Sequence, residues 1–297
     1  MAAGFYGTLK PGMPAGSHAF SVGSMRCTVL SDGYFSYPAE WLFSNVEPAT
    51  LRQALAGRHL PPDEVLSPYT CLLIETGRHV VLADTGGGTG CPTTGAIRAR
   101  LDQAGLRPQD IDTVILSHAH PDHLGGAVDR EGRSAFPNAR YVISETEWEF
   151  WMGGRTDLSA MDIPDEVKRT TLNQTRRCLP VLRHQVETIC RETEIVPGLW
   201  AIPAPGHTPG HLAMLLASGN DRLLNIADAA LHPLHLERPD WHNAIDLARD
   251  AAAITRRCLL ERAVAEDMRV MGFHFPFPSI GRIEPRREGG WEWSPGW

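Results

Sequence analysis

Four residues of types that bind metal ions, His118, His120, Asp122 and His123, lie in one short segment, ILSHAHPDHLGG. The segment follows an apolar run, and two histidines separated by one residue at a strand end project to the same side. The proline after them favours a turn that brings Asp122 and His123 round at the start of a helix. Imidazole and carboxylate are ligands of Zn²⁺, Mn²⁺, Co²⁺ and Fe²⁺. The pattern therefore predicts a metal site rather than a polar turn that carries histidines by chance.

Three further strand ends offer ligands that would extend this site. His207 follows a strand in PAPGHTPGH, Asp228 ends the apolar run LLNIAD, and His274 ends RVMGFH. Each lies where an apolar run enters a turn, the kind of place where functional groups gather on a rigid frame. A buried, unpaired carboxylate at Asp228 would be costly, and a metal ion would explain it.

The remaining histidines favour other interpretations. We expect surface positions for the five that lie in polar or loop segments: His18, His59, His79, His184 and His242. His211 begins a strand, which favours a structural role over a ligand role. His232 and His235 follow Asp228 closely, and either could line a pocket beside it.

The composition excludes several classes of protein. The chain has 297 residues, 42% of them hydrophobic and 21% charged, which is ordinary globular composition. The net charge of −7 without blocks of like charge argues against a nucleic-acid partner. No apolar run reaches membrane-spanning length, and the N-terminal segment lacks the apolar core of a signal peptide. Six scattered cysteines without a Cys-x-x-Cys pair indicate reduced thiols, so we expect a cytoplasmic protein.

The expected elements alternate between strands or hairpins and helices. Helices are predicted at residues 47–57, 95–106, from 144, about 165–185, and 245–267. Strands and hairpins are predicted at residues 20–33 (closing at Asp32-Gly33), 71–88, 108–118, 140–144, 199–207, 211–228 and 269–274. This order predicts an α/β fold with two sheets packed together and helices outside, as a single domain over residues 1–297. Residues 1–18, rich in Gly and Pro, are expected to form an N-terminal arm.

The motifs SHAHPDHLGG, PGHTPGH, NIAD and GFHFPFPSIG, in that order, resemble the metallo-β-lactamase superfamily of dinuclear metal hydrolases. The likeness covers most of the chain from about residue 20. The segments HFPFPSIGRI and ETEWEFW and the long helix before His274 look most like the methyl parathion hydrolase branch, close to the acyl-homoserine lactonases. The resemblance implies an αββα sandwich of two mixed β-sheets flanked by helices, with the site at one edge between the sheets.

The resemblance also implies a role for each candidate ligand. His118, His120 and His207 would hold one divalent ion, Asp122, His123 and His274 the other, and Asp228 would bridge them. Zinc is the first expectation for both ions, with manganese, cobalt or iron as alternatives. A hydroxide held between the ions would attack the substrate, and Asp122 could also hold or shuttle the proton. Asp84 matches an aspartate behind the site that orients a ligand histidine; a simple turn aspartate is the alternative.

Substrate assignment within the superfamily rests on fewer residues. His120 stands where the flavo-diiron oxygen reductases carry Glu, which favours a hydrolase. Leu231 stands where many acyl-homoserine lactonases carry a tyrosine. Trp148 and Trp151, three apart on a predicted helix, share a face; the resemblance implies an apolar substrate pocket there, with core packing as the alternative, and His232 is a further pocket candidate.

We therefore expect a metal-dependent hydrolase of a small, neutral, apolar lactone or aryl ester. The first alternative is an organophosphate triester hydrolase; a β-lactamase, an iron-dependent redox enzyme and a metal-binding protein without hydrolytic activity also remain open. The resemblance, together with the N-terminal arm, implies a homodimer, and we expect neither a nucleic-acid nor a membrane partner.

Overall fold

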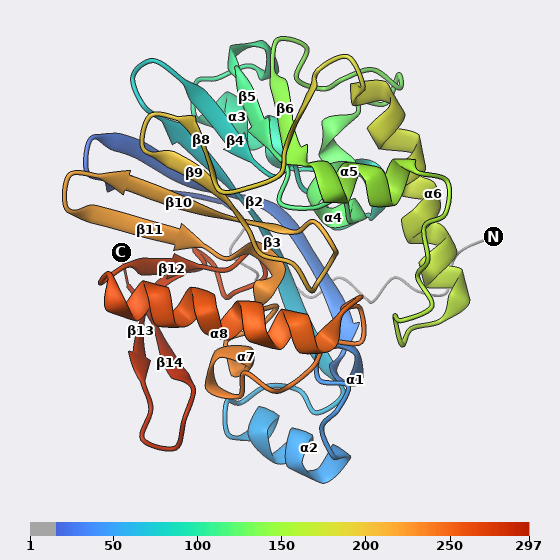
Figure 1. Ribbon diagram of the computed structural model, residues 1–297, viewed down its shortest axis with the longest axis vertical. Coiled ribbons are helices and arrows are strands. Elements are labelled where there is room, and N and C mark those ends of the chain that lie inside the picture. Colours follow the sequence, from blue (N-terminus) through green and yellow to red (C-terminus); the bar gives the residue numbers. More distant parts are fainter. Residues whose placement is uncertain (1–15, 297) are drawn as a thin grey trace.

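Two seven-stranded β-sheets pack against each other in the computed structural model, which describes residues 16–296 (Figure 1). The first sheet contains, in spatial order, β1 (Ser17–Val22), β2 (Met25–Pro38), β3 (Glu64–Glu75), β4 (Val80–Ala83), β5 (Thr113–Ile115), β6 (Arg140–Ser144) and β7 (Val186–Ile189). The second contains β14 (Trp291–Pro295), β13 (Ile280–Pro285), β12 (Arg269–Met271), β11 (Asp221–Asn225), β10 (Leu212–Ser218), β9 (Leu199–Pro203) and β8 (Thr193–Val196). Both sheets are mixed, because β4 to β7 pair parallel in the first and β11 pairs parallel with β12 in the second.

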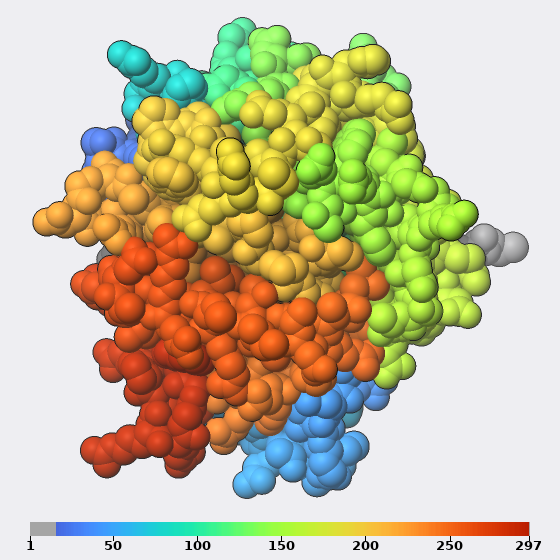
Figure 2. Space-filling model, viewed as in Figure 1, coloured from blue at the N-terminus to red at the C-terminus, as the bar shows by residue number. Residues whose placement is uncertain are grey.

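Helices lie around the two packed sheets. They are α1 (Ala39–Leu42), α2 (Pro48–Ala56), α3 (Ile97–Gln103), α4 (Pro121–Leu124), α5 (Glu145–Met152), α6 (Asp165–Leu182), α7 (Leu234–Glu237) and α8 (Arg249–Ala265). The orange α8 lies over the second sheet, while the green and yellow α5 and α6 lie beside the first (Figure 1). The space-filling view shows these segments forming much of the surface on this side (Figure 2).

Alternation along the strands separates the layers of the core. In β10, Met214 and Leu216 face the other sheet, whereas Leu215 faces the side that α8 covers. Leu72 of β3 likewise lies in the core between the sheets, and its neighbour Leu73 packs on the helical side. Strands buried on both faces require this continuous apolar sequence. The predicted αββα sandwich is confirmed.

One boundary prediction was wrong. The second strand does not close at Asp32-Gly33 but continues as β2 to Pro38, with a register shift at Gly33 where φ is +140°. Asp32 is not a turn residue, since its carboxylate accepts hydrogen bonds from the N–H groups of Gly87, Gly95 and Ile97. The predicted arm lies mostly outside the described residues, and its last two residues belong to β1, paired with β2.

Several elements were not predicted from the sequence. The short strands β7 and β8 and the C-terminal hairpin β13–β14 lack a strong apolar period and form the edges of the sheets. None of the helices in residues 16–296 is long and apolar enough to cross a membrane. All six cysteines lie in this range and are free. The single-domain assignment stays a prediction.

Candidate metal centre

The seven predicted ligands come from four loops at one edge of the paired sheets. Four of them lie on the segment that leaves β5 and enters α4, whose first residue is Pro121. The other three follow β9, β11 and β12 respectively, with Asp228 in a short 3-10 turn. In the second sheet β9, β11 and β12 run in the same direction, because β10 is antiparallel to both β9 and β11 and β12 is parallel to β11. Their carboxyl ends therefore lie at one edge of that sheet, which gathers loops that are far apart in sequence.

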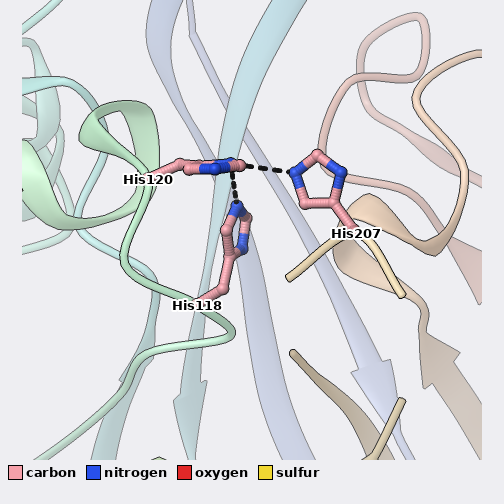
Figure 3. A group of neighbouring side chains, drawn as sticks. All are labelled: His118, His120 and His207. Carbon is pink, nitrogen blue, oxygen red and sulfur yellow. Dashed lines mark hydrogen bonds between the residues drawn. The ribbon is translucent and has the colours of Figure 1, made fainter. Parts of the chain in front are cut away.

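The first group consists of His118, His120 and His207. Nδ1 of His120 lies 3.0 Å from Nε2 of His118 and 2.9 Å from Nε2 of His207 (Figure 3). All three side chains are buried. Burial and the neighbouring imidazoles hold the pKa values of His118 and His120 well below the usual value, which leaves these rings neutral. Three imidazoles with converging nitrogens form a suitable ligand set for a divalent cation.

The second group consists of Asp122, His123, Asp228 and His274. Nε2 of His274 lies 3.3 Å from Oδ2 of Asp122, and Nε2 of His123 lies 3.3 Å from Oδ1 of Asp228. Burial favours the neutral acids, but His123 and His274 outweigh it and lower the pKa values of both carboxyls. Burial likewise favours neutral imidazole, but the carboxylates raise the pKa of His274 to about 9 and that of His123 well above its usual range.

Asp228 lies between the two groups. Its Oδ2 is 3.3 Å from Nε2 of His207 and 3.9 Å from Nε2 of His118, both in the first group. The same oxygen is 3.3 Å from Nε2 of His274 in the second group. The carboxylate is therefore placed where one side chain can serve two ions.

The candidate ligands fit a pair of divalent ions. Within each group the candidate ligand atoms all lie within 4.8 Å of one another. Nε2 of His123 and Oδ1 of Asp228 are buried and lie 3.3 Å apart, but their contact does not have hydrogen-bond geometry, and within the described residues neither atom has another hydrogen-bond partner. Buried polar atoms without partners are costly, and metal ligation would satisfy both. His118, His120 and His207 can hold one ion, and Asp122, His123 and His274 the other, with Asp228 shared.

Polar groups behind the site fix the orientation of the ligand rings. Nδ1–H of His123 donates to Oδ2 of Asp84 at 2.9 Å, and Nδ1–H of His207 donates to Oδ1 of Asp246 at 2.8 Å. Nδ1 of His274 lies 3.1 Å from the carbonyl oxygen of Pro68. These contacts turn the Nε2 atoms toward the metal groups, as partners of metal-binding histidines commonly do.

Ser117 and Asp246 were missed by the sequence analysis. Ser117 O–H donates to Asp84, and its oxygen lies 3.1 Å from Nδ1 of His118. Asp246 lies on the chain before α8, 39 residues from its partner His207. No spacing in the sequence connects these residues to the ligands, although Ser117 adjoins the first of them.

The other histidines are distributed as follows. His59 and His184 are exposed, whereas His18, His79 and His242 are partly buried. His211 is buried and accepts a hydrogen bond from the backbone N–H of Asp228, which supports the structural interpretation. His235 is buried against Phe43 and contacts the carbonyl oxygen of Leu42 at 2.8 Å.

His232 and the two tryptophans have different environments. His232 accepts a hydrogen bond from the N–H of Leu234 and packs edge-on against Phe43. Trp151 is 1% exposed, with its ring 5.8 Å from that of His120. Trp148 instead lines a surface hollow together with Met152, Arg183, Val186 and Thr188, among others. None of the seven candidate ligands lines that hollow, and the role of Trp148 in a substrate pocket stays a prediction.

Two tyrosines lie beside the second group. The hydroxyls of Tyr37 and Tyr69 are 2.7 Å apart, and their rings lie 6.3 Å and 5.3 Å from the ring of His274. Burial and the nearby Asp122 carboxylate raise the pKa of Tyr37 well above 10, so its hydroxyl keeps its proton. Leu231 is 3% exposed and packs with Leu42 and Phe43, and it has no donor to offer.

Comparisons with known proteins agree with this architecture. The family model described as the metallo-beta-lactamase superfamily matches residues 66–274. An N-acyl homoserine lactonase of Bacillus cereus is 27% identical over 186 residues, which are 56% of this chain and 65% of that protein. The uncharacterized protein YobT of Bacillus subtilis is 29% identical over 150 residues, 50% of this chain and 58% of that protein. The chain thus spans about three fifths of the length of these curated relatives.

Solved structures extend the likeness to nearly the whole chain. The structure of AidC, a dizinc quorum-quenching lactonase in complex with a product, has a TM-score of 0.88 and 26% identity, covering 95% of this chain and 98% of AidC. The hydrolase AbOPH has a TM-score of 0.86 and 23% identity, covering 96% and 99% of the two chains. Because its sequence identity is only 23%, the similarity to AbOPH shows a shared fold and nothing about activity.

Proposed function

The chain belongs to the metallo-beta-lactamase superfamily, and we propose that it is a dinuclear metal-dependent hydrolase that cleaves a lactone or ester. The acyl-homoserine lactone type is the first expectation and an aryl ester the second. The similarity to a dizinc lactonase over 95% of this chain supports the lactone.

The position of Asp228 carries this proposal. Its Oδ2 is 3.3 Å from a nitrogen of His207 in the first group and 3.3 Å from a nitrogen of His274 in the second. A site for a single ion would not require a carboxylate between two separate groups of histidines. This geometry supports two ions that act on the same substrate.

Two divalent ions held there would lower the pKa of a bound water toward neutrality and polarise the oxygen of the scissile bond. The protein supplies the proton acceptor. The side chain of Asp122 is 15% exposed, whereas that of Asp228 is 3% exposed, so solvent reaches Asp122 more readily. We assign the proton of the attacking water to the Asp122 carboxylate, which His123 and His274 keep ionised.

The residues around the seven candidate ligands support a small, neutral and apolar substrate. Across residues 16–296, the hydrogen bonds and ion pairs of the seven ligands involve histidine, carboxylate, serine or backbone groups, and none involves Arg or Lys. Recognition of a phosphate dianion or of a β-lactam carboxylate normally needs such a cation. Aromatic rings of Tyr37, Tyr69 and Phe273 pack against the ligand histidines and supply apolar surface.

Substrate turnover by protein of known metal content tests the proposal. The panel consists of an acyl-homoserine lactone, an aryl ester, an aryl phosphotriester and a cephalosporin, assayed with zinc-loaded protein. We expect the highest kcat/KM on the lactone or the aryl ester. A preference for the phosphotriester would favour the organophosphate alternative, and a preference for the cephalosporin would contradict the substrate class. Activity that appears only with iron and oxygen would contradict the hydrolase itself.

The remaining proposals concern assembly and location. We propose a homodimer with neither a nucleic-acid nor a membrane partner, in the cytoplasm. Light scattering at micromolar protein concentration tests the dimer, and a mass that equals one chain would contradict it.

A further inference from the structure

Glu147 is a buried carboxylate that is not among the candidate ligands. It lies in the first turn of α5 and is fully buried. An ionisable group in such a place is costly unless its oxygens are satisfied. The partners of Glu147 therefore indicate what it contributes.

The two oxygens of Glu147 bind two different loops of the metal centre. Oε1 accepts a hydrogen bond of 3.0 Å from the backbone N–H of Ala119, the residue between His118 and His120. Oε2 accepts one of 3.0 Å from the backbone N–H of Gly210, in the loop that carries His207. One side chain thus joins the two segments that supply the first group of ligands.

The same carboxylate also fixes the ring that packs on His120. Oε1 accepts a second hydrogen bond, of 2.7 Å, from the indole N–H of Trp151, one helical turn further along α5. The indole lies 5.8 Å from the imidazole of His120 at an interplanar angle of 76°. Trp151 is thereby held in one orientation against a candidate ligand.

The loop after His207 approaches Glu147 too closely to shift without disturbing it. A Cβ atom on Gly210 would lie 2.2 Å from the backbone nitrogen of Glu147, so only glycine permits this approach. On the opposite side, the hydroxyl of Thr175 in α6 donates to the carbonyl oxygen of Ala119 at 2.8 Å. Both backbone groups of Ala119 are therefore bound by helices that carry no ligand.

We propose that Glu147 is the positioning residue of the first metal group, setting the distance between the His118–His120 segment and the His207 loop. This role rests on the proposed dinuclear site. Within the described part of the chain no hydrogen bond joins Glu147 to the second group, whose rings are held by Asp84 and the Pro68 carbonyl instead. Loss of the Glu147 carboxylate should therefore weaken the binding of an ion by the first group and leave binding by the second group unchanged.

Glu147→Gln tests this separation. The variant keeps the shape but replaces one acceptor oxygen by an NH₂ group, which cannot accept from either loop. Cadmium NMR of the wild type should give one resonance for each group, and His120→Ala should identify the first and His274→Ala the second. In Glu147→Gln we expect the affinity for the first ion to fall about 10- to 100-fold, as for other residues that orient metal ligands. The second resonance should be retained.

A matched control is Asp32→Asn. Asp32 is also a buried carboxylate that accepts three backbone N–H groups, but from a loop that carries no candidate ligand. If Asp32→Asn and Glu147→Gln lower the affinity of the first group for its ion equally, the loss reflects general destabilisation and the proposal is overturned. If Glu147→Gln does not fold, Trp151→Phe serves in its place. This variant should lower the affinity of the first group for its ion to a smaller extent, and an unchanged affinity would overturn the proposal.

Two results separate this role from the proposed function. A wild-type protein that binds no cadmium, zinc, manganese or cobalt would contradict the dinuclear site. Two resonances in the wild type that persist with equal affinity in Glu147→Gln would leave the dinuclear site intact and overturn only the role of Glu147.

Discussion

Oδ1 of Asp246 lies 2.8 Å from Nδ1 of His207, and the opposite nitrogen of the same ring lies 3.3 Å from Oδ2 of Asp228. His207 is thus held between a carboxylate outside the candidate ligand set and a carboxylate inside it. The outer contact fixes the tautomer in which Nε2 presents its lone pair to the first group.

Removal of the Asp246 charge should weaken the binding of the ion by the first group. In Asp246→Asn the side-chain amide can present its NH₂ to Nδ1 of His207, which then no longer needs to carry the proton. We expect metal affinity and kcat/KM to fall about 10- to 100-fold without loss of the fold. Metal titration together with circular dichroism measures both, and unchanged affinity in a folded variant would contradict the orienting role.

Tyr37 is the candidate donor to the substrate oxygen. Its hydroxyl pairs with that of Tyr69 beside His274, and Leu231 has no donor to offer. We expect Tyr37→Phe to lower kcat by about 100-fold on the best substrate, the scale of one lost donor to a developing oxyanion. Metal content should stay at the wild-type value. Equal kcat in wild type and variant would contradict this assignment, and Tyr69→Phe serves as the matched comparison, with a smaller expected loss.

Trp151 should matter for stability more than its neighbour on α5. Trp151 is 1% exposed and packs in the main core, whereas Trp148 is only partly buried. Trp151→Ala should lower the free energy of unfolding by about 3–5 kcal/mol, as for other buried tryptophans. Trp148→Ala should lower the free energy of unfolding by a clearly smaller amount. Denaturant titrations of the two variants compare them directly, and equal losses would contradict the burial difference.

The protonation of His235 should contribute to acid unfolding. Burial, with the charges of Arg256 and His232, lowers the pKa of His235 well below 6.5 in the folded chain. Below about pH 6.5 the unfolded chain therefore binds a proton that the folded chain does not, so the free energy of unfolding falls as pH falls. This contribution is about 1.4 kcal/mol per pH unit.

His235→Gln removes this proton while its amide can still donate to the carbonyl oxygen of Leu42. Between about pH 6 and pH 4 the stability of the variant should therefore fall less steeply than that of the wild type, by about 1.4 kcal/mol per pH unit. Denaturant titrations in the same metal state at each pH measure the two slopes. Identical slopes would show that His235 takes up no proton on unfolding.

The sequence contains direct signals for the candidate ligands but not for the residues that hold them. His118, His207 and His274 each follow an apolar run, so their place at strand ends can be read from local pattern alone. Asp246 and Glu147 act across long separations in the chain, and their partners are defined only once the loops are packed.

Parts of the fold also depend on partners that are distant in the sequence and have no local signal. Strands with alternating or continuous apolar sequence, such as those that form β6 and β10, were predicted close to their observed bounds. The continuation of β2 past Gly33 depends on its pairing with residues 64–69 of β3, which no local pattern reports. Trp148 and Trp151 share a helical period, yet only Trp151 lies against a candidate ligand.

The most direct measurement of the central claim compares metal content and turnover of the wild type and Asp228→Ala. We expect about two divalent ions per wild-type chain by elemental analysis. Removal of the shared carboxylate should release at least one ion and lower turnover about a thousandfold, equivalent to about 4 kcal/mol of lost transition-state stabilisation. Asp165→Ala, which removes a carboxylate whose side chain is 83% exposed on α6, should match the wild type in both respects. Near-full activity of Asp228→Ala, or a wild-type protein that binds no metal after addition of zinc, manganese or cobalt, would contradict the account.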